Sequence, residues 1–171
     1  SRYLFYLYFI NLKIFFSGFL NLKDTFKHKG LRKQLVATLV EKGIENTAVL
    51  EAIGSIPRHL FMDSGFLEHA YQDKAFPIAA SQTISQPYTV AFQSELLEVK
   101  PSDKVLEVGT GSGYQTAVLC ELGAKVYSIE RQNELYKKTS KFLPKLGYRA
   151  KKLIFGDGYI GLEEEAPFDG I

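Results

Sequence analysis

The segment Lys104–Tyr114 reads Lys-Val-Leu-Glu-Val-Gly-Thr-Gly-Ser-Gly-Tyr, and it decides the fold. Its first half is a short apolar run with β-branched residues, which predicts a buried parallel strand. Glycines then stand at every second position, where the lack of a Cβ lets the backbone turn sharply and approach a ligand. Ser112 is expected to cap a helix over Tyr114–Leu122. Strand, glycine turn and helix N-terminus together favour the start of a Rossmann-like βαβ unit that holds a cofactor.

The glycine spacing distinguishes between two classes of cofactor site. A dinucleotide fingerprint is Gly-x-Gly-x-x-Gly, whereas this segment is Glu-x-Gly-x-Gly-x-Gly, with Glu107 two residues before the first glycine. That order resembles motif I of the class I methyltransferases, which bind S-adenosylmethionine. A tight turn that binds no ligand is the alternative for the glycines taken alone, so the neighbouring sequence has to decide.

Length and composition limit the remaining possibilities. The 171 residues suffice for one domain with a substantial core. A net charge of +2 gives no electrostatic reason to expect nucleic acid as the partner. The single Cys120 excludes an intrachain disulfide and fits a reducing, cytoplasmic compartment. The three histidines are scattered and no Cys/His cluster has metal-ligand spacing, so no metal is expected.

Ser1–Phe26 has a composition unlike the rest, because six of the thirteen Phe lie in it. A membrane-spanning helix needs about 20 apolar residues, and Lys13 interrupts this run near its middle. Three interpretations stay open: an uncleaved membrane or export segment, a helix packed on the domain or a partner, or translated sequence before the true start. A membrane partner is not expected, although the apolar segment is unexplained. We predict three regions, residues 1–26, residues 27–100 and a cofactor-binding region at 101–171.

The middle region is predicted to be helical with one long irregular segment. Apolar spacing predicts a helix over Leu31–Glu41, and Asn46 or Thr47 can cap a second short helix. The irregular segment Pro57–Pro87 carries several aromatic residues, which argue against disorder. A further helix is expected over Tyr88–Glu98. Gln82–Tyr88 offers hydroxyl and amide groups that suit a small polar ligand, although ordinary turn hydrogen bonding is the commoner use of such residues.

Alternating strands and helices follow the glycine turn. Lys125–Ile129 predicts a second strand, and Glu130 closes it about 20 residues after the first glycine, where βαβ sites place a ribose-binding carboxylate. Arg131–Leu146 is amphipathic, and Lys152–Phe155 predicts a third strand that leads into Gly-Asp-Gly. Pro167-Phe168-Asp169 is expected to open a fourth strand. The chain therefore predicts an α/β fold of three layers, αβα, with a mostly parallel and here incomplete sheet.

Five motifs in order resemble the protein-L-isoaspartate (D-aspartate) O-methyltransferases, from about residue 31 to residue 171. They are Gln-Thr-Ile-Ser-Gln-Pro-Tyr at 82–88, Val-Leu-Glu-Val-Gly-Thr-Gly-Ser-Gly-Tyr-Gln at 105–115, Val-Tyr-Ser-Ile-Glu-Arg at 126–131, Gly-Asp-Gly at 156–158 and Ala-Pro-Phe-Asp at 166–169. The Thr-Ile-Ser block ahead of motif I is the family's own mark. The resemblance implies a class I methyltransferase of the Rossmann-like type that uses S-adenosylmethionine.

The resemblance also assigns a function and site residues. The enzyme would methylate the free α-carboxylate of L-isoaspartyl and D-aspartyl residues in damaged proteins and peptides, and the ester would close to a succinimide that partly restores aspartate. Ser85 would be the active-site residue beside the substrate carboxylate. The implied substrate residues are Thr83, Pro87 and Tyr88. The implied cofactor residues are Glu107, Gly109, Thr110, Gly111, Gly113, Glu130, Arg131, Asp157 and Gly158. No metal is implied, and a complete chain is expected to be a monomer.

The sequence departs from the family pattern in two ways. Ala79 and Ser81 stand where members usually carry glycine, and the family continues beyond Ile171 with further strands. We therefore interpret the chain as the amino-terminal part of such an enzyme. A catalytically inactive fragment or binding module of the family is the alternative, and an NAD-dependent oxidoreductase is a weaker one, because it rests on the glycine turn and Glu130 alone.

Overall fold

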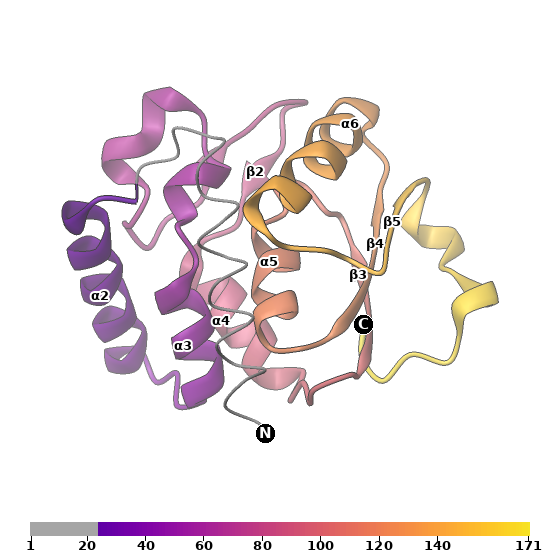
Figure 1. The fold of residues 1–171 in the computed structure, drawn as a ribbon, viewed down its shortest axis with the longest axis horizontal. Helices are drawn as coiled ribbons and strands as arrows, with labels where there is room; N and C mark the ends of the chain where they lie inside the picture. The colour runs from indigo at the N-terminus through magenta and orange to yellow at the C-terminus, as the bar shows by residue number, and fades with distance from the viewer. Residues whose placement is uncertain (1–23) are drawn as a thin grey trace, which may run out of the picture.

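A three-stranded parallel sheet organises the chain, which we describe from a computed structural model for residues 24–171 (Figure 1). Its strands are β3 (Lys104–Val108), β4 (Lys125–Glu130) and β5 (Lys152–Phe155). They lie in the order β3-β4-β5, and both neighbouring pairs are parallel. The three predicted strands are confirmed, and their carboxyl ends meet at one edge of the sheet, the edge at which parallel α/β folds bind ligands.

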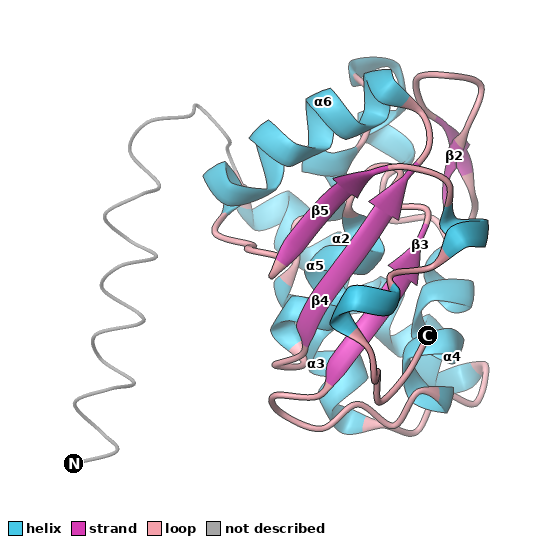
Figure 2. Cartoon of the chain, turned by 90° about the vertical axis from the view of Figure 1, so that its right-hand side faces the viewer, coloured by secondary structure: helices cyan, strands magenta, loops and turns pink. Residues whose placement is uncertain are grey.

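The two faces of the sheet are covered differently in the described part of the chain (Figure 2). Helices α5 (Tyr114–Glu121) and α6 (Asn133–Phe142) connect the strands and cover the same face. The opposite face holds a small apolar cluster in which Leu162 and Phe168 cover the strand residues. Leu162 lies between the short turns η4 (Gly158–Ile160) and η5 (Glu163–Glu165), and Phe168 follows η5. This arrangement is an incomplete αβα fold, as predicted.

Three helices form a second layer outside α5. They are α2 (Phe26–Glu41), α3 (Thr47–Ser55) and α4 (Pro87–Leu96). Buried side chains of this layer join those of α5 in one apolar cluster, so the predicted middle and cofactor-binding regions share a core. Helix α2 begins five residues before the predicted start, because a capping box closes its first turn. The Thr25 hydroxyl accepts the His28 backbone N–H, and the His28 side chain accepts the Thr25 backbone N–H. Asn46 caps α3, as predicted.

The irregular segment Pro57–Pro87 contains a hairpin that the sequence did not predict. Two short 3₁₀ turns, η1 (Arg58–Phe61) and η2 (Ser64–His69), precede it. Strand β1 (Phe76–Pro77) then pairs antiparallel with β2 (Thr83–Ile84). Each strand has two residues, which is too short to show an alternating pattern.

Several predicted boundaries need correction. Pro167-Phe168-Asp169 leads into a parallel bridge between Val105 and Gly170, in which the Leu106 backbone N–H donates to the Gly170 carbonyl at 3.0 Å; the predicted pairing begins beside β3 but is a single bridge rather than a strand. The N-cap of α5 is Gly113 rather than Ser112, although the Ser112 hydroxyl accepts the Tyr114 backbone N–H at 3.3 Å. Helix α4 ends at Leu96, and the chain breaks from helical geometry at Glu98, whose φ is 47°.

The predicted N-terminal region lies mostly outside the described residues. Asp24, Thr25 and Phe26 are its described members, and Phe26 already belongs to α2. Among residues 24–171, no helix combines the length and the apolar character needed to cross a bilayer.

Candidate active site

The glycine turn lies at the carboxyl edge of the sheet, between β3 and α5. The Gly109 backbone N–H donates to the Ile129 carbonyl at 2.8 Å, which ties the turn to β4. Gly113 has a φ of +82°, and a Cβ there would lie 2.8 Å from Cγ2 of Thr139 in α6. The Thr139 hydroxyl also donates to the Gly111 carbonyl at 2.8 Å. The turn therefore needs glycine at 113 for both backbone and space, and α6 fixes it from outside.

Glu130 meets the glycine turn from the end of β4. Its Oε2 accepts the Gly111 backbone N–H at 2.8 Å, and its Oε1 accepts the Gln132 backbone N–H at 2.7 Å. The side chain is buried. Each carboxylate oxygen has a second lone pair, so Glu130 can clamp the turn and still accept hydroxyl groups from a ligand. The two motifs that the sequence paired by spacing are thus in direct contact.

Glu107 faces the interior rather than this edge. Its Oε2 accepts hydrogen bonds from Thr116 of α5 at 2.6 Å and from Ser128 of β4 at 2.5 Å, and its Oε1 is buried without a described partner. Ser128 has one hydroxyl proton, so the 2.6 Å contact to Thr110 requires Thr110 to donate. Burial raises the pKa of Glu107 to about 7. A chain of hydrogen bonds through Ser128 and Thr110 therefore links the Glu107 carboxyl group to the glycine turn.

The end of β5 completes this edge. Asp157 is exposed, and its carboxylate accepts the Tyr159 backbone N–H at 3.0 Å. A Cβ on Gly158 would clash with Cγ1 of Val108, so the glycine allows close packing against the end of β3. Arg131 is exposed directly after Glu130. The predicted cofactor residues thus line one edge formed by three strands, apart from the Glu107 carboxylate.

The predicted substrate residues lie on residues 76–88, which comprise β1, β2 and the start of α4. We call this stretch the hairpin segment, and it lies next to the glycine turn. Thr83 and Ser85 are exposed, and Pro87 is the buried first residue of α4. Asp73 holds Tyr88 in place, because its carboxylate accepts the Tyr88 backbone N–H at 2.7 Å. The hairpin reaches the turn directly. A Cβ on Gly111 would lie 3.9 Å from Cδ1 of Ile78, which follows β1.

Comparison with known proteins agrees with this geometry. Residues 30–171 match the family described as protein-L-isoaspartate (D-aspartate) O-methyltransferase. The chain belongs to this family. A protein-L-isoaspartate O-methyltransferase of Christiangramia forsetii is 75% identical over 150 residues, which are 88% of this chain and 70% of that protein. The enzyme of the same name from Flavobacterium psychrophilum is 72% identical over 150 residues, with the same coverage.

Solved structures support the same fold. A protein-L-isoaspartate O-methyltransferase superposes with a TM-score of 0.71 at 27% identity, covering 80% of this chain and 45% of that one. A Plasmodium falciparum member, solved with S-adenosyl-L-homocysteine, superposes with a TM-score of 0.63 at 25% identity, covering 78% of this chain and 66% of that one. The predicted family, its class of enzyme, its isoaspartyl-repair reaction, its use of S-adenosylmethionine and the αβα fold are confirmed.

Several side chains that support the candidate site were not predicted. They are Arg58, Asp73, Thr116, Ser128 and Thr139. Each makes a hydrogen bond to a residue at least nine positions away. No local pattern marks such contacts. The sequence does not distinguish Arg58 and Asp73 from Asp63, Glu68 and Lys74, which are charged residues of the same segment.

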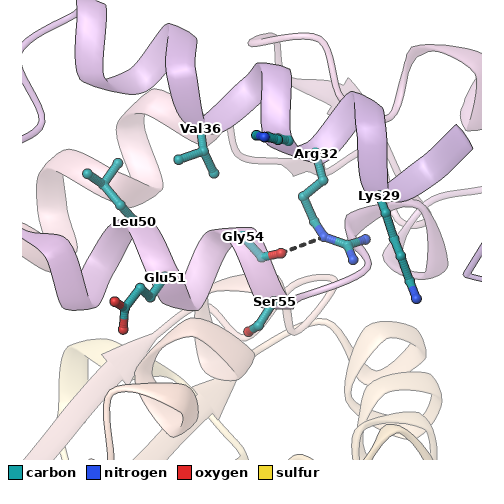
Figure 3. A pocket seen from close by; sticks show the side chains of 8 residues that line it. Lys29, Arg32, Val36, Leu50, Glu51, Gly54 and Ser55 are labelled. Atoms are coloured by element: carbon teal, nitrogen blue, oxygen red, sulfur yellow. Dashed lines mark hydrogen bonds between the residues drawn. The ribbon is translucent and has the colours of Figure 1, made fainter. Parts of the chain in front are cut away.

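A groove of about 550 Å³ lies elsewhere, between α2 and α3 (Figure 3). Val36 and Leu50 face each other across it, and Arg32 donates from its Nε to the Gly54 carbonyl at 2.7 Å. None of its lining residues belongs to the predicted site. The residues of the candidate site lie instead at the carboxyl edge of the sheet.

One described side-chain cluster has the composition of a metal site: Asp24, His28 and His59. Its hydrogen bonds argue against a metal. Asp24 already forms two hydrogen bonds to Arg32, at 2.9 and 3.0 Å. His28 Nδ1 accepts a backbone N–H at the start of α2, and His59 Nδ1 lies 2.7 Å from the Tyr71 hydroxyl. The Asp24 carboxylate and the Nδ1 atoms of His28 and His59 therefore already have hydrogen-bond partners within the protein.

Proposed function

We propose that the glycine turn and Glu130 of this chain bind S-adenosylmethionine. The observation that carries the proposal is the 2.8 Å hydrogen bond from the Gly111 backbone N–H to the Glu130 carboxylate. It fixes a turn of small residues beside a buried carboxylate whose remaining lone pairs suit the two hydroxyls of a ribose. Thr110 and Arg131 flank these groups. Asp157 and Gly158, at the end of the next strand, are placed to line the adenine side.

Glu107 has a different role in this proposal. Its carboxylate bonds to Thr116 and Ser128 inside the protein, so it would support the turn through Thr110 rather than touch the cofactor. The role implied by the family resemblance was a direct one.

We further propose that the hairpin segment binds the substrate. Residues 27–100 would supply the isoaspartyl side of the site, and residues 101–171 the cofactor side. Thr83 and Ser85 offer exposed hydroxyls. Pro87 and Tyr88 begin α4, and the Tyr88 backbone N–H already donates to Asp73, so the exposed hydroxyls are the groups left for the substrate. The Ser85 hydroxyl would orient the substrate carboxylate.

The reaction places modest demands on the protein. S-Adenosylmethionine supplies a methyl group already activated on its sulfonium and leaves as S-adenosylhomocysteine. The free α-carboxylate of an isoaspartyl residue is an adequate nucleophile, so no base has to remove a proton. The chain has to align two reactants and exclude competing orientations, an effect worth at most ~7–11 kcal/mol in well-oriented systems.

Methyl transfer to matched peptides tests this proposal. A peptide with one isoaspartyl residue and the same sequence with aspartate are incubated with labelled S-adenosylmethionine. We expect methylation of the isoaspartyl peptide alone, and a raised KM for that peptide in Ser85→Ala. Equal labelling of both peptides would contradict the proposed substrate. S-Adenosylhomocysteine binding without any labelling would favour the alternative of an inactive binding module.

We also propose a monomer in the cytoplasm. The free Cys120 supports the compartment. Burial raises the pKa of its thiol to about 12, so it is a packing residue with little thiolate.

A further inference from the structure

Arg58 is the largest fully buried side chain in the described part of the chain. Within residues 24–171, no carboxylate lies at ion-pair distance from its guanidinium. A buried charge without an acid is costly unless other groups satisfy it. Its partners therefore indicate what the side chain does.

The Arg58 guanidinium donates hydrogen bonds to three backbone carbonyls at separate places in the irregular segment. Its Nε donates to Ala70 at 2.9 Å, at the end of η2. One terminal nitrogen, Nη2, donates to Lys74 at 3.1 Å, in the turn before β1. The other, Nη1, donates to the carbonyl of Ser85 at 3.0 Å, just after β2. A planar fork of donors suits this task, and an ammonium group does not reproduce it.

A fourth contact links Arg58 to the cofactor side. Its guanidinium carbon lies 5.0 Å from the centre of the Tyr114 ring, within the range of a cation–π interaction. Tyr114 is the first residue of α5 and directly follows Gly113. One side chain thus touches the helix that starts at the glycine turn and holds the backbone of the residue we assign to the substrate carboxylate.

We propose that Arg58 is a positioning residue for methyl transfer, which holds Ser85 at a fixed place relative to the glycine turn. The inference rests on the proposed function and extends it to a residue that touches neither cofactor nor substrate. In-line transfer depends on alignment, and a misplacement of about 1 Å can cost about 100-fold in rate. Losing Arg58 therefore affects turnover more than cofactor affinity.

Arg58→Lys is the test variant, and Arg32→Lys is its matched control. Arg32 is also a buried arginine whose Nε donates to a backbone carbonyl, that of Gly54 at 2.7 Å. It lies on α2, pairs with Asp24 and donates to the Tyr71 hydroxyl at 3.1 Å, and it has no described contact with residues 76–88. The measurements are Tm, S-adenosylhomocysteine affinity, and kcat and KM for an isoaspartyl peptide, at a temperature well below the lowest Tm.

We expect Arg58→Lys to lower kcat/KM by about 10- to 100-fold while the S-adenosylhomocysteine Kd changes by less than about threefold. Arg32→Lys lowers Tm but leaves kcat/KM within about threefold. Equal losses of kcat/KM in the two variants, or none in Arg58→Lys, would overturn the positioning role. A wild-type chain that methylates no isoaspartyl peptide would instead overturn the proposed function.

A backbone change covers the case in which Arg58→Lys does not fold. Replacing Gln86 by its α-hydroxy analogue turns the Ser85–Gln86 amide into an ester and weakens the Ser85 carbonyl as an acceptor. The buried arginine and its other contacts stay in place. We expect kcat to fall about 10-fold with unchanged S-adenosylhomocysteine affinity. An unchanged kcat would overturn the proposal.

Discussion

The glycine turn and the hairpin segment form two sides of one site, but they are held in different ways. The turn is fixed by its glycine conformations and by backbone N–H groups that donate to Ile129 and Glu130 of the adjacent strand β4. The hairpin segment has strands of only two residues and is held instead by the side chains of Arg58 and Asp73. The cofactor side should therefore tolerate changes in the hairpin segment, whereas a change at the turn should affect the whole domain.

Gly113→Ala should have the largest effect. The residue has a φ of +82°, and the new Cβ would lie 2.8 Å from Thr139 and 3.0 Å from Leu143. We expect a loss of about 3 kcal/mol or more in unfolding free energy, because strain and overpacking act together. Denaturant unfolding measures it.

Gly147→Ala is the control for that substitution. Gly147 has a φ of +90°, but a Cβ there meets nothing within 4 Å. It should cost about 1 kcal/mol for backbone strain alone. Equal losses at positions 113 and 147 would show that contact with α6 does not fix the turn.

Glu107→Gln should change the pH dependence of stability. Burial raises the pKa of Glu107 from 4.5 to about 7, so the folded chain binds this proton more tightly than the unfolded chain. The stability from the protonated form is complete below pH 4.5 and is lost as pH rises through about 7. That loss is up to about 3 kcal/mol.

Unfolding at pH 5 and pH 8 checks this expectation. The variant should be less sensitive to pH than the wild type and more stable than it at pH 8. Parallel pH profiles for the two proteins would contradict the buried, protonated state of Glu107.

Asp73→Ala should weaken the hairpin side alone. The carboxylate pairs with Lys42 at 2.5 Å and accepts the Tyr88 backbone N–H at 2.7 Å and the Gln86 side-chain amide at 3.0 Å. The hydrogen bond from Lys42, followed by those from Tyr88 and Gln86, holds the pKa of Asp73 below its usual value against the effect of burial. We expect a loss of about 2 kcal/mol and a higher peptide KM, with unchanged S-adenosylhomocysteine affinity.

Asp63→Ala is the control for Asp73→Ala. Asp63 pairs with Lys138 at 3.3 Å on the surface, so its loss should cost less than about 0.5 kcal/mol. A drop in cofactor affinity in Asp73→Ala would show that the two sides of the site are not separable.

Ser81→Gly should have the smallest effect, and it stabilises. Ser81 has a φ of 55° in the hairpin turn, a conformation that favours glycine, so we expect a gain of about 0.5–1 kcal/mol. Ala79 is the other position at which the family resemblance implied glycine, and its φ is not positive. Ala79→Gly should therefore lose up to about 1 kcal/mol, and a Tm shift of the same sign in both variants would contradict the turn geometry.

The same difference explains how far the sequence could be interpreted. The three strands, the glycine turn and Glu130 are marked by composition and spacing within single βαβ units, and they were predicted within a residue or two. The β1–β2 hairpin, the inward position of Glu107 and the contacts of Arg58 result from packing between distant segments. A pattern in one segment does not show which carbonyl or hydroxyl another segment will bring to it.

The most direct test of the central claim is isothermal titration of the chain with S-adenosylhomocysteine, with NAD as the comparison ligand. Glu130→Ala is the test variant, and Glu134→Ala, an exposed acid in the first turn of α6, is the control. We predict one S-adenosylhomocysteine site per chain, no NAD binding, and an affinity at least about 10-fold weaker in Glu130→Ala alone. Tight NAD binding, or an S-adenosylhomocysteine affinity that is unchanged in Glu130→Ala, would contradict the account.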